Sequence, residues 1–281
     1  MKDDRPSATA YRVAMRRAAH QLLDRPVVLD DPIALQIVGS RAAETIRSNP
    51  RRYDSGFGRA LRLFLVARSR VAEDALAAAV TAGVRQYVVL GAGLDTFAYR
   101  NPHDSLRVFE VDFPATQAWK RELLARTRIA VPGTLTFVPV DFETQTLAER
   151  LAAAGFQADQ PAFFSWLGVS MYLTRDAVIA TLGFVARGAP GSGITFDYLL
   201  PPSSLPLLRR IGFHLLQRRL AKAGEPWRTW FAPAELRREL EALGFTRFED
   251  LDANAINARL FDGTQRRLGG RSVGHILTAW R

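Results

Sequence analysis

Two glycines and an aspartate are the residues whose types and spacing point most clearly to chemistry. Gly91 and Gly93 directly follow the apolar run 87–90. Glycines at such a turn let the chain reverse sharply and let a ligand lie directly on the backbone. Asp112 ends the next apolar run, about 20 residues further on, where nucleotide-binding folds place the acid that binds ribose hydroxyls. The spacing predicts Asp112 as a ribose ligand.

The same turn argues against a dinucleotide. A dinucleotide turn needs a third small residue three positions after the second glycine, so that the helix can pack on the strand. Thr96 stands at this position. A sulfonium nucleoside remains possible, and so does an ordinary α/β turn in which the acid only caps a helix.

A third apolar run, residues 135–140, also ends in an acid, Asp141, which is followed by Phe142. Successive parallel strands deliver such residues to one carboxyl edge of a sheet, where open α/β sheets bind ligands. A carboxylate can accept a hydrogen bond from an exocyclic amine, and an aromatic ring can cover a base. Asp141 and Phe142 therefore suit adenine, with a helix N-cap as the alternative role of Asp141.

The elements that must position these residues alternate along the chain. Apolar periodicity predicts helices near 8–23, 32–38, 41–48 and 57–81. Strands are predicted near 86–90, 106–111, 135–140, 161–166, 193–199, 245–251 and 273–280, with helices between most of them. This alternation is typical of an α/β, doubly wound, Rossmann-like sheet.

Several ordered motifs resemble the leucine carboxyl methyltransferase family, in particular its bacterial branch of S-adenosylmethionine-dependent O-methyltransferases. They are Ala-Arg-Ser-Arg at 67–70, Leu-Gly-Ala-Gly-Leu-Asp-Thr at 90–96, Tyr-Arg at 99–100, Glu-Val-Asp at 110–112, Val-Asp-Phe at 140–142 and the run from Phe163 to Leu173. The resemblance implies a class I methyltransferase sheet of seven strands, the last antiparallel, and S-adenosylmethionine as cofactor.

The resemblance also implies roles for single residues. Arg68, at the end of the helix before the first strand, is expected to pair with the methionyl carboxylate, with Arg70 as the fallback. Gly91 and Gly93 would pass beneath the methionyl and ribose portion, Asp112 would bind the ribose, and Asp141 with Phe142 would hold adenine. The chain departs from the family's Glu-Gly pair after the fourth strand, where it has Leu167-Gly168. One cofactor contact of the eukaryotic enzymes is therefore not expected here.

The organisation predicted is one methyltransferase domain over residues 1–281. Its parts are an N-terminal helical cap (1–56), a cofactor-binding core (57–200), a helical lid insertion after the fifth strand (201–232) and the C-terminal part of the core (233–281). Residues 205–223 are apolar on one face and basic on the other, as in an amphipathic helix. Segments 1–70 and 201–238 together carry a charge of +13, against −3 for the remainder. A positive rim would attract an anionic substrate. The alternative is a compositional preference for arginine, which accounts for 35 of the 38 basic residues and would make many solvent-exposed faces basic whatever the function.

The acceptor side has weaker candidates at strand ends and in the insertion. They are Tyr172, Asp197, Tyr198, Arg209, Arg210 and Arg228. The tyrosines could instead pack against the lid with satisfied hydroxyls, and the arginines could face solvent. His20 is expected at the surface of the first helix and not as a base.

These observations predict an S-adenosylmethionine-dependent methyltransferase that acts on a carboxylate or hydroxyl of a small, possibly anionic acceptor. The alternatives are a protein C-terminal carboxyl methyltransferase, a nucleic-acid-modifying enzyme and a non-catalytic nucleotide-binding module. The basic residues are not interleaved with an aromatic stacking platform, which argues against nucleic acid. The chain has no cysteine, and its four histidines show no ligand spacing, so no metal is expected. Neither a signal peptide nor a membrane span is expected, which predicts a cytoplasmic protein.

Overall fold

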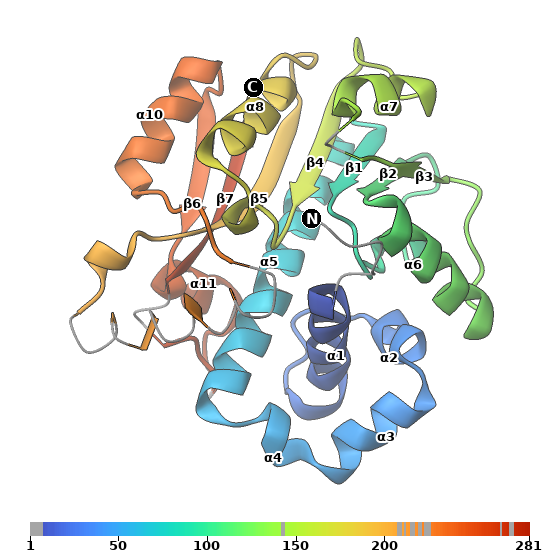
Figure 1. Ribbon diagram of the computed structural model, residues 1–281, viewed down its shortest axis with the longest axis vertical. Coiled ribbons are helices and arrows are strands. Elements are labelled where there is room, and N and C mark those ends of the chain that lie inside the picture. Colours follow the sequence, from blue (N-terminus) through green and yellow to red (C-terminus); the bar gives the residue numbers. More distant parts are fainter. Residues whose placement is uncertain are drawn as a thin grey trace.

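The computed structural model describes residues 8–141, 144–206, 210, 212–213, 217–218, 221, 226–264, 266–269 and 273–281. Seven strands form one sheet: β1 (Gln86–Leu90), β2 (Arg107–Asp112), β3 (Leu135–Pro139), β4 (Ala162–Trp166), β5 (Gly193–Leu199), β6 (Arg247–Leu251) and β7 (Gly274–Trp280). Their order is β3-β2-β1-β4-β5-β7-β6, and β7 runs antiparallel to both of its neighbours. The predicted α/β sheet with an antiparallel last strand is confirmed (Figure 1).

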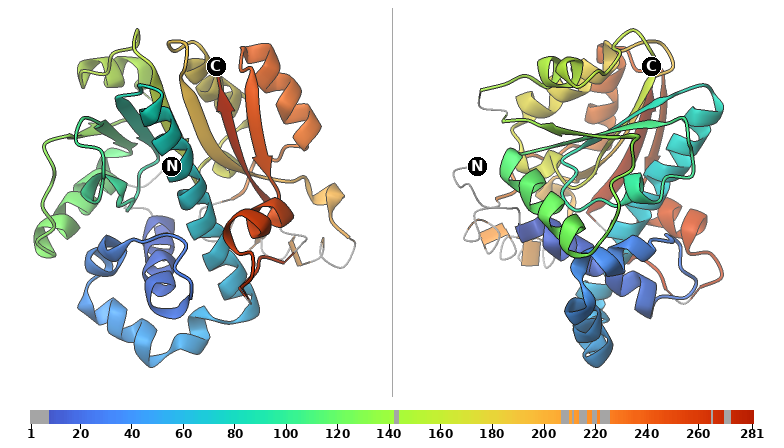
Figure 2. Two further views of the ribbon diagram at one scale, coloured as in Figure 1. Left: turned by 180° about the vertical axis from the view of Figure 1, so that it is seen from behind. Right: turned by 90° about the vertical axis from the view of Figure 1, so that its right-hand side faces the viewer.

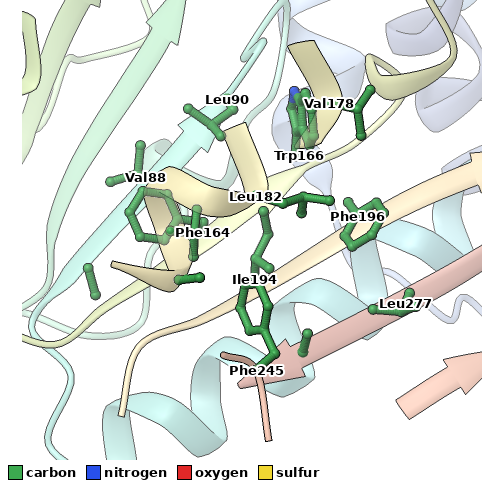
Figure 3. Close-up of a cluster of buried hydrophobic side chains, with 14 of the residues drawn as sticks. Val88, Leu90, Phe164, Trp166, Val178, Leu182, Ile194, Phe196, Phe245 and Leu277 are labelled. Atoms are coloured by element: carbon green, nitrogen blue, oxygen red, sulfur yellow. The ribbon is translucent and has the colours of Figure 1, made fainter. Parts of the chain in front are cut away.

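Helices cover both faces of this sheet, which explains why the central strands are apolar without alternation. Every residue of β1, β4 and β5 is buried. One face packs against α7 (Leu147–Ala153), α8 (Arg175–Ala186) and α10 (Pro233–Leu243). Figure 3 shows this cluster, in which Leu182 of α8 lies between Phe164 of β4 and Phe196 of β5, and Val178 of α8 lies next to Trp166. The other face packs against α5 (Gly56–Thr81) and α11 (Ala253–Leu260), which lie in front in the left view of Figure 2.

The N-terminal helices form a separate layer at the carboxyl ends of the strands. α1 (Ala8–Leu23), α2 (Pro32–Val38), α3 (Ser40–Ser48) and α4 (Pro50–Tyr53) precede α5, and α6 (Pro114–Arg126) packs beside them. The arrow of β4 in Figure 1 points toward α1. The N-terminal helices therefore cover the carboxyl edge of the sheet, where the predicted site residues lie.

A buried ion network ties α1 to α5. Arg62 of α5 is fully buried and donates to both carboxylate oxygens of Asp24 at 2.7 Å and to Asp54 at 2.9 Å. Burial alone would raise the pKa of Asp24, but hydrogen bonds from Arg62 and His20 outweigh it and lower the pKa to about 2. His20 itself is fully buried, with Nδ1 bonded to Asp24 at 2.8 Å. Its predicted surface position was wrong, because this acid and the Leu29 amide satisfy both ring nitrogens.

The insertion after β5 is described only in part. It begins with the short helix η3 (Pro202–Ser204) and returns to the core where the Phe231 amide donates to the Leu199 carbonyl. Phe213 is buried against Trp227, with ring centroids 5.4 Å apart. Arg209 and much of the predicted amphipathic helix lie outside the described residues. No helix among the described residues combines the length and the apolar character needed to cross a membrane.

Candidate functional site

A cavity of about 830 Å³ lies at the carboxyl ends of β1, β2 and β4. Seven of the predicted site residues line it: Arg68, Gly91, Gly93, Asp112, Asp141, Tyr172 and Arg228. Thr9, Ala10 and Val13 of α1 close one side. Two further candidates, Phe142 and Arg209, lie outside the described residues. The structure thus brings together residues that are up to 219 positions apart in the sequence, from Thr9 to Arg228.

The glycine turn and Asp112 form one hydrogen-bonded unit at the floor of this cavity. Gly91 and Gly93 both have positive φ, +66° and +48°, a conformation that favours glycine. The Asp112 carboxylate accepts hydrogen bonds from the amides of Gly93, at 2.5 Å, and of Phe113, at 2.7 Å. Burial raises the pKa of Asp112, and these two amides oppose the rise. The acid is therefore held at the edge of the turn while its side chain still lines the cavity.

Gly91 also has no room for a side chain. A Cβ built there would lie 2.4 Å from Cγ2 of Val169, in the loop that follows β4. We expect Gly91→Ala to destabilise the fold by about 1–3 kcal/mol, because left-handed strain and overpacking add. Gly83→Ala is the matched control, since Gly83 also has positive φ but nothing within 4 Å of the added carbon.

The measurement for this prediction is the free energy of unfolding in urea for Gly91→Ala, Gly83→Ala and Val169→Ala with and without Gly91→Ala. Shortening Val169 should remove the part of the Gly91→Ala loss that exceeds the Gly83→Ala loss. Equal losses at the two glycines would show that Val169 does not restrict the turn.

Two buried cations form hydrogen bonds with the residues that directly follow the glycine turn. Lys120 of α6 donates to the Asp95 carbonyl at 2.7 Å and to the Glu110 carboxylate at 2.6 Å. Burial raises the pKa of Glu110 to about 7, although Lys120 opposes this. Arg17 of α1 donates to Asp95 at 3.0 Å and to the Thr96 hydroxyl at 2.7 Å. The turn is thereby joined to α6 and to the N-terminal layer.

The sequence reasoning missed Lys120 and Arg17, although helix periodicity contains the signal. Lys120 lies four residues from Thr116 and from Leu124, and all three are buried. Arg17 lies three residues after Ala14, which is also buried. A cation on a buried helix face requires an anionic or carbonyl partner.

Arg68 lies on the cavity wall but not where the sequence placed it along its helix. It stands in the middle of α5, which spans Gly56–Thr81, and not at its end. Its Nη1 donates to Asp197 of β5 at 2.8 Å, and only 8% of its side chain is exposed. Arg70, the fallback, is about half exposed and pairs with Asp74 at 2.7 Å. Since Arg70 does not line the cavity, the structure favours Arg68 for contact with a ligand.

Asp141 follows β3 and lines the cavity, as do Leu147 of α7 and Ala177 of α8. Its backbone carbonyl accepts hydrogen bonds from Thr144 and Gln145, so the chain turns immediately after the strand. The helix that follows, α7, has Thr146 as its N-cap, in a capping box with Glu149. Asp141 therefore does not cap α7, which removes that alternative role.

The acceptor-side candidates separate into two groups. Tyr172 and Arg228 line the cavity, and the Arg228 amide donates to the Met171 carbonyl at 2.7 Å. Tyr198 was predicted for the same side, and this was wrong. Its hydroxyl donates to Asp250 of β6 at 2.6 Å, and its ring belongs to the core on the far face of β5. Successive strand residues point to opposite faces, so Asp197 approaches α5 while Tyr198 points away.

The polar side chains of the cavity suit a nucleoside whose tail carries a carboxylate. An acid held at a glycine turn suits ribose hydroxyls, and a second acid one strand away suits an exocyclic amine. Nε of Arg68 is buried and has no hydrogen-bond partner among the described residues. An anion that bound from the cavity side would accept a hydrogen bond from this Nε. A buried charged donor requires such a partner.

Comparison with known proteins gives concordant results. Residues 10–186 match the family described as leucine carboxyl methyltransferase. A Bacillus subtilis protein, YktD, named as a candidate S-adenosyl-L-methionine-dependent methyltransferase, is 31% identical over 99% of both chains. A similarly named Frankia alni protein is 37% identical over 66% of each chain. The crystal structure of a candidate methyltransferase from Thermobifida fusca covers 100% of this chain and 96% of its own, with a TM-score of 0.59 at 17% identity.

Proposed function

Since the chain belongs to the leucine carboxyl methyltransferase family and is an S-adenosylmethionine-dependent methyltransferase, we propose that it methylates an oxygen of a small anionic acceptor, preferably a carboxylate. The observation that carries this proposal is the single cavity in which the predicted cofactor residues meet Tyr172 and Arg228. Its volume of about 830 Å³ lies near the upper end of the roughly 300–1,000 Å³ usual for ligand pockets. That leaves room for a cofactor and a small acceptor together.

Each residue that would hold the cofactor contacts a different part of it. Asp112 would accept hydrogen bonds from the ribose hydroxyls, and Gly91 with Gly93 would let the cofactor lie on the backbone. Asp141 would accept from the adenine amine, with Phe142 covering the base. Arg68 would pair with the methionyl carboxylate. Each assignment matches a side chain of the right charge to a polar group of the cofactor.

When bound, S-adenosylmethionine supplies a methyl group that is already activated on a positively charged sulfur. The chain's own task is then to align the acceptor oxygen and to exclude water, which can supply about 7–11 kcal/mol of the barrier. A carboxylate acceptor needs no general base at neutral pH, whereas a hydroxyl acceptor benefits from one.

Arg228 supports an anionic acceptor. Arg17 and Arg68 line the same cavity, but both are already paired with buried acids. Arg228 is exposed and lines the cavity, and its backbone amide donates to the Met171 carbonyl. A guanidinium in this position would attract a carboxylate and orient it by two parallel hydrogen bonds.

The test is a screen of small carboxylic acids, phenols and peptides with free C-termini, using ¹³C-methyl-labelled S-adenosylmethionine and NMR detection of the product. We expect a labelled methyl ester of a small acid. Arg228→Met should raise KM for that acid about tenfold with little change in kcat, and Arg187→Met, outside the cavity, serves as control. Label on a peptide C-terminus, on a phenol or on nitrogen would contradict the proposal.

A further inference from the structure

The guanidinium of Arg68 is bound by Asp197, a buried acid that does not itself line the cavity. Asp197 lies in the middle of β5, is 1% exposed and is absent from the described lining of the cavity. Its Oδ2 accepts a hydrogen bond from Nη1 of Arg68 at 2.8 Å. Arg68 therefore stands between this acid and the cavity, with Nη1 occupied and Nε without a partner among the described residues.

The other oxygens of Asp197 fix the loop that follows β4. Oδ1 accepts from the Gly168 amide at 2.5 Å, and the backbone carbonyl accepts from the Ser170 hydroxyl at 2.6 Å. This loop continues to Tyr172 and carries Val169, both of which line the cavity. One buried residue thus sets the position of the cation on α5 and of the neighbouring loop after β4.

Gly168 completes this arrangement from the other side of the guanidinium. Its φ is +77°, and a Cβ built there would lie 2.7 Å from both terminal nitrogens of Arg68. The backbone of Gly168 therefore lies against the guanidinium where any side chain would displace it. Asp197 and Gly168 together leave Arg68 a narrow range of positions.

We propose that Asp197 is a positioning residue that orients Arg68 toward the carboxylate of the cofactor, and so makes the site selective for ligands that carry this carboxylate. The inference rests on the proposed role of Arg68. An arginine that is already ordered loses less side-chain entropy on binding than a mobile one does. An unpaired buried guanidinium would instead turn toward water or another acid.

An acid in the middle of an apolar strand is itself the sequence signal for such a role. β5 reads Gly-Ile-Thr-Phe-Asp-Tyr-Leu and is buried throughout. A buried carboxylate is retained only with charged or hydrogen-bonding partners, and the Asp197 carboxylate has a cation and a backbone amide. These partners come from α5 and from the loop after β4, which both contribute residues to the lining of the cavity.

The experiment compares two ligands by calorimetric titration. S-adenosylhomocysteine carries the methionyl carboxylate, whereas 5′-methylthioadenosine has the same nucleoside and sulfur without the amino-acid part. For Asp197→Asn we expect the Kd of S-adenosylhomocysteine to rise about tenfold, or 1.4 kcal/mol, while that of methylthioadenosine stays within about twofold. Parallel weakening of both ligands would show a merely structural role and overturn the proposal. Tighter binding of S-adenosylhomocysteine would also overturn it, since Asp197 would then be competing with the ligand's carboxylate.

Two further variants separate geometry from charge. Gly168→Ala keeps the Asp197 carboxylate but pushes the guanidinium aside, and it should reduce the preference for S-adenosylhomocysteine in the same way. Asp250→Asn is the control, because this acid is bonded to Tyr198 and His275 at the other side of β5. It should leave the ratio of the two dissociation constants unchanged.

Arg68→Met distinguishes failure of this inference from failure of the proposed function. If wild type binds neither ligand, the assignment of the cavity is wrong. If it binds both but Arg68→Met keeps the preference for S-adenosylhomocysteine, the role of Arg68 is wrong. If Arg68→Met abolishes the preference and Asp197→Asn keeps it, only the role of Asp197 is wrong.

Discussion

Replacing Asp112 by alanine is expected to weaken the binding of S-adenosylhomocysteine about 100-fold. A hydrogen bond to a charged group contributes about 1.5–3 kcal/mol, and the carboxylate would accept from two ribose hydroxyls. The substitution also removes the acceptor for the Gly93 amide, so the turn itself is less well held. Calorimetric titration measures the loss. Unlike Asp197→Asn, this variant should weaken methylthioadenosine equally, because both ligands carry the ribose.

The control for this prediction is Asp104→Ala, which removes an exposed acid from the loop before β2. It should bind S-adenosylhomocysteine as wild type does. Thermal melts of both variants establish that each is folded at the temperature of the titration. A change below about threefold in folded Asp112→Ala would mean that the ribose is bound elsewhere.

Replacing Arg62 by leucine is expected to lower the free energy of unfolding by about 3–5 kcal/mol. Arg62 is fully buried, and its removal leaves Asp24 without its main cationic partner and Asp54 with fewer donors. Breaking a buried ion pair from one side leaves an uncompensated charge, which accounts for losses of this size. Urea denaturation followed by circular dichroism measures the change. The largest effect should appear in the N-terminal layer, because Arg62 joins α1 and the segment after α4 to α5.

Arg70→Leu is the matched control for Arg62→Leu. Arg70 lies two turns along the same helix, but it is about half exposed and pairs with Asp74 four residues away. Exposed pairs contribute about 0–1 kcal/mol. Similar losses for the two variants, or a loss below 1 kcal/mol at Arg62, would show that the buried network does not hold the layer.

The sheet and the floor of the site could be predicted because they depend on local patterns. The unbroken apolar runs, the glycines at 91 and 93 and the acid at the end of each following strand are all readable within about 50 residues. Parallel strands then bring their carboxyl ends together whatever the rest of the chain does. The seven strands and the placement of Asp112 beside Gly93 follow from this rule.

The contacts that could not be predicted join residues far apart in the sequence. Arg68 and Asp197 are separated by 129 positions, and Arg17 and Asp95 by 78. Glu73 and Asp74 are the acids nearest to Arg68 along the same helix. In the folded chain Glu73 instead forms an ion pair with Arg100, and Arg68 faces the sheet, where it pairs with Asp197. His20 was misplaced although its partners Asp24 and Leu29 lie only four and nine positions away, because Asp24 is itself bound by Arg62 of α5, 38 positions further along the chain.

Tyr198 was misplaced for a different reason. Its position at the end of β5 correctly placed it near the site edge, but a strand alternates its side chains between two faces. The choice of face depends on what covers each side, and here α5 covers one and α8 with α10 the other. Asp197 and Tyr198 were named together, and only the former faces Arg68.

The most direct test of the account is a crystal structure of the protein with S-adenosylhomocysteine. The ribose hydroxyls should lie on the Asp112 carboxylate, the methionyl carboxylate on Arg68 and the adenine amine near Asp141, with the sulfur facing the space lined by Tyr172 and Arg228. A ligand bound outside this cavity, or bound with its carboxylate away from Arg68, would contradict the assignment.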